Sequence, residues 1–366
     1  MSVGQHARTV GARIAGVVSC VPPRIVDNSH FAETFGADAV RDVTKMIGVE
    51  QRRYVEPGIA TSDLCFLAAE RLIQKLDWAR DSIDGLIFVS QSADYLLPAT
   101  ACMLQDRLKL RTTLPAYDVS LGCSGYPYGL WLAMMAVQTG AARRILLCVG
   151  DVSTRRSDPT DRATVMLFGD AGTVTAIEAG DEGDVTHFVL GTDGRGAENL
   201  IIPSTWHRSR KAEGRLAGRN LDMLYMDGGE IFNFTLKSVP PLIRDLVEVS
   251  GKSIDEYDAF LLHQANMFMI KHIAKKAKLP PEKVPINIDR FGNTSSASIP
   301  MLMCTDLGEQ LGRQKMRLGL FGFGVGYSWA AASLEVGPLA CVELLTPDVG
   351  EIRPFPEETA EIQQVA

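Results

Sequence analysis

Several features common in other protein classes are missing from this chain, and each absence narrows its function. The seven cysteines include no C-x-x-C pair, and their odd number and scattered positions argue against a disulfide framework or a zinc site. No apolar run reaches the length of a membrane span, and Met1–Ile14 lacks the apolar segment of a signal peptide. We therefore expect a cytoplasmic protein without a metal site or a membrane anchor.

A strong excess of basic residues is also missing. The net charge is −7, and the segment 340–366 carries six acids and one base, so the remaining body is close to neutral. A body without a basic excess does not fit a nucleic-acid-binding protein. The same segment holds prolines at 347, 354 and 356, and we predict an acidic C-terminal tail that lies on the surface.

Short apolar runs alternate with helical patterns through most of the chain. The runs predicted as strands are 12–18, 85–89, 115–119, 145–149, 172–179, 188–191, 259–262 and 318–322. The patterns predicted as helices are 62–75, 100–108, 130–138, 230–250, 267–277 and 298–309. This alternation predicts an α/β protein with substantial parallel sheet, in two halves of residues 1–184 and 185–339.

Cys123 is the first residue whose sequence context indicates a catalytic role. It lies in the run Tyr117–Gly129, after a predicted strand and before a predicted helix, and Gly122 and Gly125 leave space around its sulfur. Free N–H groups and the dipole at a helix N-terminus both favour a thiolate over a thiol. We therefore predict that Cys123 is a nucleophile.

Two later segments add candidate partners for this thiol. His263 ends an apolar strand, and Asn293 lies in a loop of small residues. Alone, the histidine fits a structural hydrogen bond equally well, and the asparagine fits an ordinary turn. Together the three supply a nucleophile and two neutral donors for a developing oxyanion. Two other hypotheses are a Cys-His-Asn hydrolase and an inactive scaffold. The hydrolase is disfavoured because the cysteine follows a sheet-rich first third of the chain. The inactive scaffold is disfavoured because all three reactive residues are present.

The motifs around these residues resemble those of β-ketoacyl-acyl-carrier-protein synthase III, a condensing enzyme of the thiolase superfamily. The resemblance runs from about Ala12 to Val336, and its signatures are Tyr117–Gly125, Ser157–Arg162, Phe168–Gly172, His263–Asn266, Asp289–Pro300 and Phe321–Trp329. It implies a homodimer with a thiolase fold, which is a five-layered αβαβα arrangement of two pseudo-repeated halves.

The resemblance also implies an acyltransferase (EC 2.3.1.-) that carries out a decarboxylative Claisen condensation. Cys123 would take an acyl group from a coenzyme A thioester, which is a substrate, and no cofactor is implied. His263 and Asn293 would hold the carbonyl of a malonyl thioester, carried on coenzyme A or an acyl carrier protein, while carbon dioxide leaves. The backbone N–H groups of Cys123 and Val325 would form an oxyanion hole, and Val325 replaces the glycine of the housekeeping enzymes.

The implied substrate-binding residues differ from those of the housekeeping enzyme. Arg162 matches an arginine that grips adenine, but no tryptophan accompanies it in residues 41–48. Phe268 occupies a basic position at the tunnel mouth, and Asn266 ends the histidine motif. Leu97 replaces an aromatic residue that reaches into the partner's acyl tunnel. These differences favour a specialised acyl or polyketide pathway over fatty-acid initiation.

Three questions stay open at this level. The basic insert 207–219 is either a docking patch for an acidic carrier protein or a solvated loop, and the lysines at 271, 275, 276 and 278 allow the same two interpretations. The stretch 90–98 offers only Asp94 where some relatives use a glutamate base, so that chemistry is disfavoured. Acyl transfer to a non-malonyl acceptor, which forms an ester or an amide, is an alternative on the same fold.

Overall fold

The computed structural model describes residues 2–204 and 207–355. The helices of this part are α1 (Ala32–Phe35), α2 (Ala37–Ile47), α3 (Thr61–Leu76), α4 (Thr100–Arg107), α5 (Gly125–Gln138), α6 (Arg162–Val165), α7 (Gly228–Val249), α8 (Met267–Ala277), α9 (Ile288–Phe291), α10 (Ser298–Thr305) and α11 (Gly308–Leu311). The first main sheet has the strand order β15 (Cys341–Leu345), β2 (Ala12–Cys20), β8 (Ala171–Ala179), β7 (Arg144–Asp151), β5 (Gly85–Val89) and β6 (Ala116–Val119). The second has the order β1 (Gln5–Val10), β9 (Val185–Thr192), β14 (Ser328–Val336), β13 (Met316–Gly324) and β12 (Ala259–Leu262). Two short pairs complete the strands: β3 (Ile25–Asp27) with β4 (Gln51–Arg53), and β10 (Leu200–Ile201) with β11 (Tyr225–Met226).

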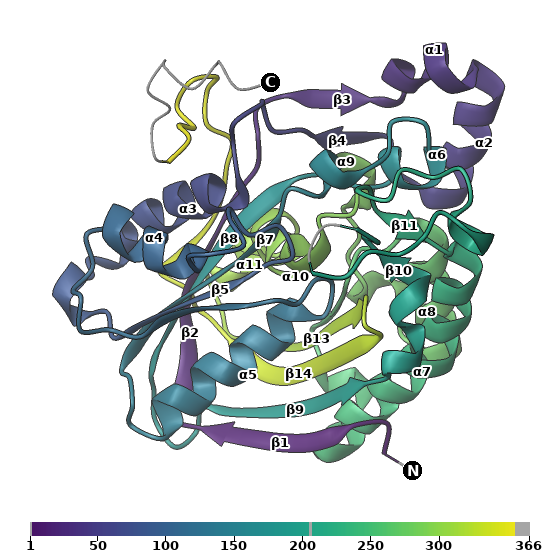
Figure 1. Cartoon of the computed structure of the whole chain (residues 1–366). Coiled ribbons are helices and arrows are strands. Elements are labelled where there is room, and N and C mark those ends of the chain that lie inside the picture. Colours follow the sequence, from purple (N-terminus) through teal and green to yellow (C-terminus); the bar gives the residue numbers. More distant parts are fainter. Residues whose placement is uncertain (1, 205–206, 356–366) are drawn as a thin grey trace.

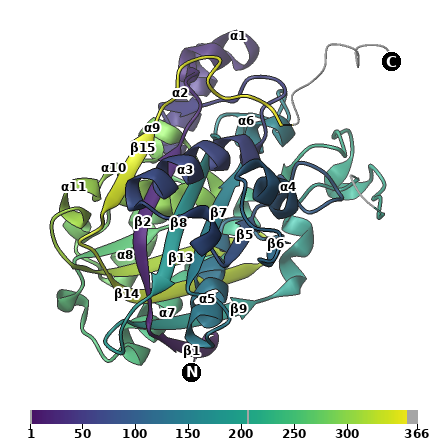
Figure 2. The same ribbon diagram turned by 90° about the vertical axis from the view of Figure 1, so that its left-hand side faces the viewer.

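Three helical layers enclose the two main sheets (Figure 1). α3 and α4 cover one face of the first sheet, α5 and α10 lie between the sheets, and α7 and α8 cover the far face of the second. Figure 2 shows α3 in front of strands β2, β8 and β7. The predicted five-layered αβαβα arrangement is confirmed.

α5 is apolar along most of its length because it packs between the two main sheets. The helix contains no charged residue, and Tyr126, Leu130, Ala133 and Met134 are fully buried. A helix that is apolar all round is the kind expected in the interior of a protein. Its N-terminus therefore lies inside the molecule, between the two sheets, and not in solvent.

Strand directions differ from the prediction of a largely parallel sheet. β5 pairs in parallel with β6 and β7, and β12 pairs in parallel with β13. The pairs β2–β8, β7–β8, β13–β14, β14–β9 and β1–β9 are antiparallel, so both sheets are mixed. β14, which the sequence patterns missed, returns alongside β13 after a short connection, and strands joined in this way are antiparallel. The helix predicted over 298–309 is interrupted between α10 and α11.

Both ends of the chain cross from one half to the other. β1, near the N-terminus, pairs with β9 in the second sheet, and β15, in the predicted tail, pairs with β2 at the edge of the first. Cys341 is 3% exposed, and Glu343 forms ion pairs with Arg71 and Lys75. The prediction of a surface tail over 340–366 is therefore wrong for 341–345, and 356–366 lie outside the described residues. The boundaries at 184 and 339 stay predictions.

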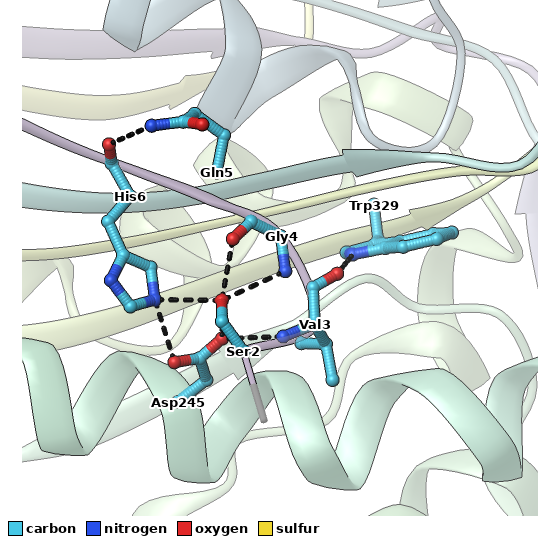
Figure 3. Close-up of polar contacts among 7 residues, drawn as sticks. All are labelled: Ser2, Val3, Gly4, Gln5, His6, Asp245 and Trp329. Atoms are coloured by element: carbon cyan, nitrogen blue, oxygen red, sulfur yellow. Dashed lines mark hydrogen bonds and ion pairs between the residues drawn. The ribbon is translucent and has the colours of Figure 1, made fainter.

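The N-terminal segment is anchored to α7 by one carboxylate (Figure 3). Asp245 Oδ2 accepts hydrogen bonds from the Ser2 hydroxyl (2.8 Å) and the Val3 N–H (2.9 Å), and Oδ1 lies 2.8 Å from His6 Nε2. The Trp329 indole N–H donates to the Val3 carbonyl at 3.0 Å. Burial acts to raise the pKa of Asp245, but the hydrogen bonds outweigh it and hold this pKa below its ordinary value.

Removal of this carboxylate should destabilise the protein. For Asp245→Ala we expect a loss of about 1–3 kcal/mol in the free energy of unfolding, because Val3 N–H and the Ser2 hydroxyl lose a buried partner. His6→Ala should cost less than about 1 kcal/mol, since the His6 side chain is 41% exposed. Urea unfolding measures both. Because the folded-state pKa of Asp245 is lowered, the difference between wild type and Asp245→Ala should shrink as the pH falls below about 4. Equal losses in the two variants would contradict the assignment.

Candidate active site

Cys123 lies in the turn that joins β6 to α5. Ser124 is the N-cap of α5, so the helix begins two residues after the cysteine, earlier than predicted. The side chain is 8% exposed, and Gly324 of β13 packs against it. A Cβ at position 324 would lie 2.8 Å from Cys123 Cβ and 3.0 Å from its sulfur. The glycine therefore keeps the space that the second sheet would otherwise fill above the thiol.

Burial and the helix N-terminus act on this thiol in opposite directions. Burial raises the pKa of Cys123 to about 12, and the nearby Asp151 carboxylate adds to the rise. The Ser295 hydroxyl and the backbone N–H groups of Cys123 and Val325 lower it. That a thiolate is favoured at this helix N-terminus stays a prediction.

The two backbone N–H groups predicted for the oxyanion hole both act on the same sulfur. They belong to Cys123 and Val325, and each stabilises negative charge on the Cys123 side chain. The Val325 side chain lies close to the turn before the cysteine, since a Cβ on Gly122 would be 3.1 Å from Val325 Cγ1. The valine side chain therefore lies against the backbone of Gly122, next to Cys123, and a narrower space beside the thiol stays a prediction.

His263 follows β12 and is 2% exposed. Its Nδ1 lies 2.8 Å from Ser298 Oγ, and the Phe323 ring meets the imidazole edge-on with centroids 5.5 Å apart. Burial lowers the pKa of His263 to about 3, so the imidazole is neutral near pH 7. A neutral imidazole carries one N–H, and with Nδ1 engaged by the serine its Nε2 is the nitrogen left for a bound molecule.

Both the oxygen and the nitrogen of the Asn293 side-chain amide form hydrogen bonds. Its Oδ1 accepts a hydrogen bond from Ser295 N–H at 2.9 Å, and its Nδ2 donates to the Ala265 carbonyl at 3.4 Å. The backbone on either side is tied to residues 167–169. Because the oxygen is engaged by a backbone donor, the orientation of the amide is set, and Nδ2 keeps a second hydrogen for another acceptor.

A cavity of about 540 Å³ opens above these side chains. Its lining includes six of the eight residues predicted for the site: Cys123, Arg162, His263, Asn266, Phe268 and Asn293. They come from four separate segments of the chain, at 123, 162, 263–268 and 293, which the fold brings to one place.

Two of the lining residues also have structural contacts. Asn266 is the N-cap of α8, and its Oδ1 accepts a hydrogen bond from Met269 N–H at 2.8 Å. Arg162 is the first residue of α6, which Asp161 caps. Substitution at Asn266 would therefore change the helix end as well as the cavity wall.

Two residues in the loop after β5 lie apart from this cavity. Leu97 is 77% exposed and does not line it, so its predicted contact with a partner subunit stays a prediction. Asp94 accepts a hydrogen bond from the Ser62 hydroxyl at 2.6 Å, and burial raises the pKa of Asp94 to about 6. Its carboxylate is thus directed toward α3.

The cavity mouth has an aromatic rim that the sequence patterns did not reveal. Phe268 is 46% exposed and stacks on Phe232 of α7 with ring centroids 5.6 Å apart, while His272 lies 4.3 Å from Phe268. Met46 of α2, which is 58% exposed, also lines the cavity. These residues belong to three different helices, so no local sequence pattern could have grouped them. The mouth is therefore apolar where the housekeeping pattern implied cations.

Serine residues that contact the reactive side chains were also missed. Ser295 and Ser298 lie beside Cys123 and His263, and Ser296 donates to the buried Asp151 at 2.9 Å. The signal that could have found them is the run of small hydroxyl residues directly after Asn293.

The basic insert 207–219 lies beside the cavity, behind the pair β10–β11. Leu200 and Met226 of this pair line the cavity, whereas Ile201 and Tyr225 line a groove of about 350 Å³ under the insert. Four cations of the insert are paired with acids: Arg210 with Glu198 (2.6 Å), Lys211 with Glu213 (4.0 Å), Arg215 with Asp227 (3.5 Å) and Arg219 with Asp161 (2.9 Å). The ion pairs of the arginines hold the insert 207–219 against its neighbours near β10–β11, which disfavours the interpretation of the insert as a free basic patch.

Within residues 2–204 and 207–355, no group of three or more His, Cys, Asp or Glu side chains is arranged to hold a metal ion. In the same part of the chain, none of the helices combines the length and the apolar character needed to cross a membrane.

Two family models match the chain. The one described as 3-oxoacyl-[acyl-carrier-protein (ACP)] synthase III covers residues 117–194, and the one for the C-terminal part of the same enzyme covers 247–336. Among curated proteins, the beta-ketoacyl-[acyl-carrier-protein] synthase III of Rhodopirellula baltica is 35% identical over 88% of this chain and 97% of its own length. The beta-ketoacyl-[acyl-carrier-protein] synthase III 2 of Streptomyces coelicolor is 33% identical over 91% and 96%.

Solved structures share the fold. A 3-oxoacyl-(acyl-carrier protein) synthase from Burkholderia xenovorans superposes with a TM-score of 0.94, is 55% identical, and covers 95% of this chain and 100% of its own. The priming β-ketosynthase of the R1128 polyketide pathway has a TM-score of 0.80 and 26% identity, over 90% of this chain and 97% of its own. The predicted thiolase fold is confirmed.

Proposed function

The chain belongs to the 3-oxoacyl-[acyl-carrier-protein] synthase III family, and from this premise we propose how its residues divide the reaction. The enzyme is an acyltransferase (EC 2.3.1.-) that joins an acyl group to a malonyl thioester by decarboxylative Claisen condensation, at the initiation of fatty-acid or polyketide synthesis. The observation that supports the division of roles is the single cavity lined by Cys123, His263 and Asn293.

In the first stage, Cys123 receives the acyl group. Its sulfur attacks the carbonyl carbon of acyl-coenzyme A, the new C–S bond forms, and the thiol of coenzyme A leaves. The oxygen of the tetrahedral intermediate accepts hydrogen bonds from the N–H groups of Cys123 and Val325, which already act on the sulfur. Coenzyme A is a substrate here, and the chemistry needs no cofactor.

In the second stage, the malonyl thioester loses carbon dioxide. His263 Nε2–H and Asn293 Nδ2–H donate to the thioester carbonyl, on which negative charge develops as the C–C bond breaks. Two fixed donors of this kind lower such a barrier by several kcal/mol, about 3 kcal/mol for each donor. The carbanion then attacks the acyl-Cys123 carbonyl, which yields the β-ketoacyl product and frees the thiol.

Ser298 selects the tautomer that this stage requires. Its hydroxyl lies 2.8 Å from His263 Nδ1 and 2.9 Å from the Ser295 carbonyl. In this structure the hydroxyl donates to that carbonyl, and because the carbonyl also accepts the backbone N–H of Ser298, the hydroxyl can turn to donate to Nδ1 and leave no buried acceptor unpaired. With Nδ1 as acceptor, the proton of the neutral imidazole is on Nε2, which faces the substrate.

At the cavity mouth, Arg162, Asn266 and Phe268 contact the coenzyme A or pantetheine arm of the incoming thioester. Arg162 supplies a cation for phosphate oxygens, and the stacked Phe268–Phe232 pair supplies an apolar face. The acyl group on Cys123 occupies the bottom of the cavity.

The malonyl group reaches this mouth on an acyl carrier protein that docks along α8. Phe268, Lys271, His272 and Lys275 form one exposed stripe that begins at the mouth. In the described part of the chain neither of these two lysines has an acidic partner, unlike the cations of the insert. Unpaired cations beside an apolar anchor complement an acidic partner, so we assign docking to α8 and not to the insert 207–219.

Charge reversal on α8 should weaken use of the carrier-bound substrate. We expect Lys271→Glu/Lys275→Glu to raise the KM for malonyl-carrier protein at least tenfold at low salt and to leave acylation by acyl-coenzyme A unchanged, because only the carrier protein reaches these lysines. Lys211→Glu in the insert is the matched control and should change KM less than twofold. Steady-state condensation kinetics at two ionic strengths measure this. A larger effect from Lys211→Glu would move the docking site to the insert.

Two copies of the chain pair through the free edge of the first sheet. β6 is the terminal strand of that sheet, and Leu97 and Tyr117 nearby are exposed apolar residues. An unpaired edge with apolar neighbours is suited to pairing with a second copy. In such a homodimer Leu97 lines the acyl pocket of the partner subunit. The cytoplasmic location stays a prediction.

Consumption of the malonyl thioester is the decisive test of the function. The acylated enzyme should release one carbon dioxide for each β-ketoacyl product formed. Ester or amide formation without carbon dioxide would favour the alternative of transfer to a non-malonyl acceptor. Hydrolysis of the acyl thioester as the sole reaction would favour a Cys-His-Asn hydrolase.

A further inference from the structure

Ser124 is the N-cap residue of α5, but its hydroxyl does not cap the helix. A serine at this position ordinarily accepts a hydrogen bond from the second or third N–H of its helix. Here the side chain is fully buried, and its Oγ lies 2.6 Å from the Oγ of Ser328, the first residue of β14. The hydroxyl therefore forms a contact with the second main sheet in place of a helix cap.

Ser328 connects this contact to the loop that carries Val325. Its hydroxyl donates to the Val325 carbonyl at 2.8 Å. A serine hydroxyl has one hydrogen, so the Ser124 hydroxyl is the donor between the two serines. Ser124 is 0% exposed and Ser328 is 3% exposed, and a buried group that loses its partner is costly. The two serines and the Val325 carbonyl thus form one continuous hydroxyl bridge, which starts at the residue directly after Cys123.

The loop at Val325 needs contacts from outside to keep one conformation. Residues 325–327 join β13 to β14, and Val325 has a glycine on each side. Gly326 has φ of +135°, and glycine backbone is freer to rotate than that of other residues. Two backbone hydrogen bonds between Tyr327 and Asp193, of 2.8 and 2.9 Å, fix the far end of the loop. The hydroxyl bridge fixes its near end, at Val325.

The same contact brings the strand before Val325 directly onto the turn that carries Cys123. A Cβ on Gly322 would lie 2.8 Å from Ser124 Cα, and a Cβ on Gly324 would lie 2.8 Å from Cys123 Cβ. β13 therefore meets the turn through backbone alone, with no side chain between them. The two donors of the proposed oxyanion hole come from the two sides of this contact, and a slip of one side against the other would separate them. Such donors work only when each lies about 3 Å from the oxyanion.

We propose that Ser124 and Ser328 are positioning residues for acyl transfer. Their hydroxyl bridge holds the N–H groups of Cys123 and Val325 at the spacing that a tetrahedral oxyanion requires. Neither serine lines the cavity, so both act through the backbone that they hold: Ser328 through the Val325 carbonyl, and Ser124 through the turn at Cys123. This inference rests on the proposed function, since the oxyanion forms while the acyl group is transferred to Cys123.

The test compares two reactions of the same sulfur. Acylation by acyl-coenzyme A passes through an oxyanion, whereas alkylation of Cys123 by iodoacetamide forms none. For Ser124→Ala we expect the maximal rate of acylation to fall about tenfold, and for Ser328→Ala about 30-fold, because the second change also frees the Val325 carbonyl. The acyl-coenzyme A concentration that gives half the maximal rate should stay within about twofold, and alkylation within about threefold. Intact mass spectrometry follows both reactions.

Ser333→Ala is the matched control. Ser333 lies on β14 like Ser328, is 2% exposed, and its hydroxyl is 2.7 Å from the Tyr257 hydroxyl, away from the cavity. Its loss removes a buried hydrogen bond of the same kind and should leave both reactions within about twofold of the wild type.

The double variant Ser124→Ala/Ser328→Ala tests whether the two serines act as one unit. It should be no slower in acylation than Ser328→Ala alone, because a bridge that is already broken cannot be broken again. Three results would overturn the proposal: acylation at the wild-type rate in Ser124→Ala, equal falls in acylation and alkylation, or effects that multiply in the double variant.

A second acyl donor separates the hydroxyl bridge from the proposed function. p-Nitrophenyl acetate acylates a thiol through a tetrahedral oxyanion and needs no recognition of coenzyme A. If no acyl-coenzyme A acylates the wild type, the proposed function fails, while the rates with this ester still decide the role of the bridge. Cys123 should then react about tenfold more slowly in Ser124→Ala than in the wild type, with Cys123→Ser as the blank. Equal rates would overturn the positioning role.

Discussion

Incubated with a panel of acyl-coenzyme A species, the wild-type chain should gain the mass of one acyl group, and Cys123→Ser should gain none. The serine hydroxyl is far less acidic than the thiol and a weaker nucleophile. Condensation should therefore fall by at least about 10³-fold. Intact mass spectrometry reads the adduct directly, and the preferred acyl chain appears as the species that reacts fastest.

Cys102→Ser is the control for this result. Cys102 is a free, exposed thiol far from the cavity lining, so its loss should leave the adduct in place. An adduct that survives in Cys123→Ser, or that disappears in Cys102→Ser, would show that the acyl group is carried elsewhere.

The second large effect concerns the two neutral donors. His263→Ala and Asn293→Ala should each still be acylated at Cys123, because neither side chain hydrogen-bonds to the sulfur. Decarboxylation of the malonyl thioester should fall by about 10²–10³-fold in each, the usual cost of removing one oxyanion donor. Release of carbon dioxide from labelled malonyl thioester, measured on pre-acylated enzyme, isolates this stage.

His30→Ala, on an exposed segment remote from the cavity, should behave as the wild type. Condensation that continues unchanged in both His263→Ala and Asn293→Ala would show that the division of roles is wrong. A loss of acylation equal to the loss of decarboxylation would assign these residues to the first stage instead.

Residues whose role follows from a short local motif could be predicted from the sequence. Cys123 precedes a helix, His263 ends a strand and Asn293 lies in a small-residue loop, and the structure places all three in one cavity. The hydrogen bond between Ser296 and the buried Asp151 could not be predicted in this way, because 145 positions separate the two residues in the chain and only the folded structure brings them together.

The ionisation state of Cys123 shows a different limit. A helix N-terminus is visible in a sequence, but the burial that opposes it depends on β13 and Gly324, which arrive from 200 residues away. The strand β15 was missed for a third reason. The acids of 340–366 dominate the average composition of this segment, and they conceal the five-residue strand Cys341–Leu345, which completes the first sheet.

The exchange of terminal strands bears on how a growing chain acquires this structure during synthesis. β1 is made first, yet Val10 must wait for Val185 before it has a partner, and β2 keeps an open edge until Cys341–Leu345 has been made. Open edges are the surfaces through which incomplete chains aggregate, and pairings so distant along the chain form slowly. The first sheet is not complete until β15, the last strand, has been made, so the nascent chain depends on protection of the open edge of β2 for nearly the whole of its synthesis.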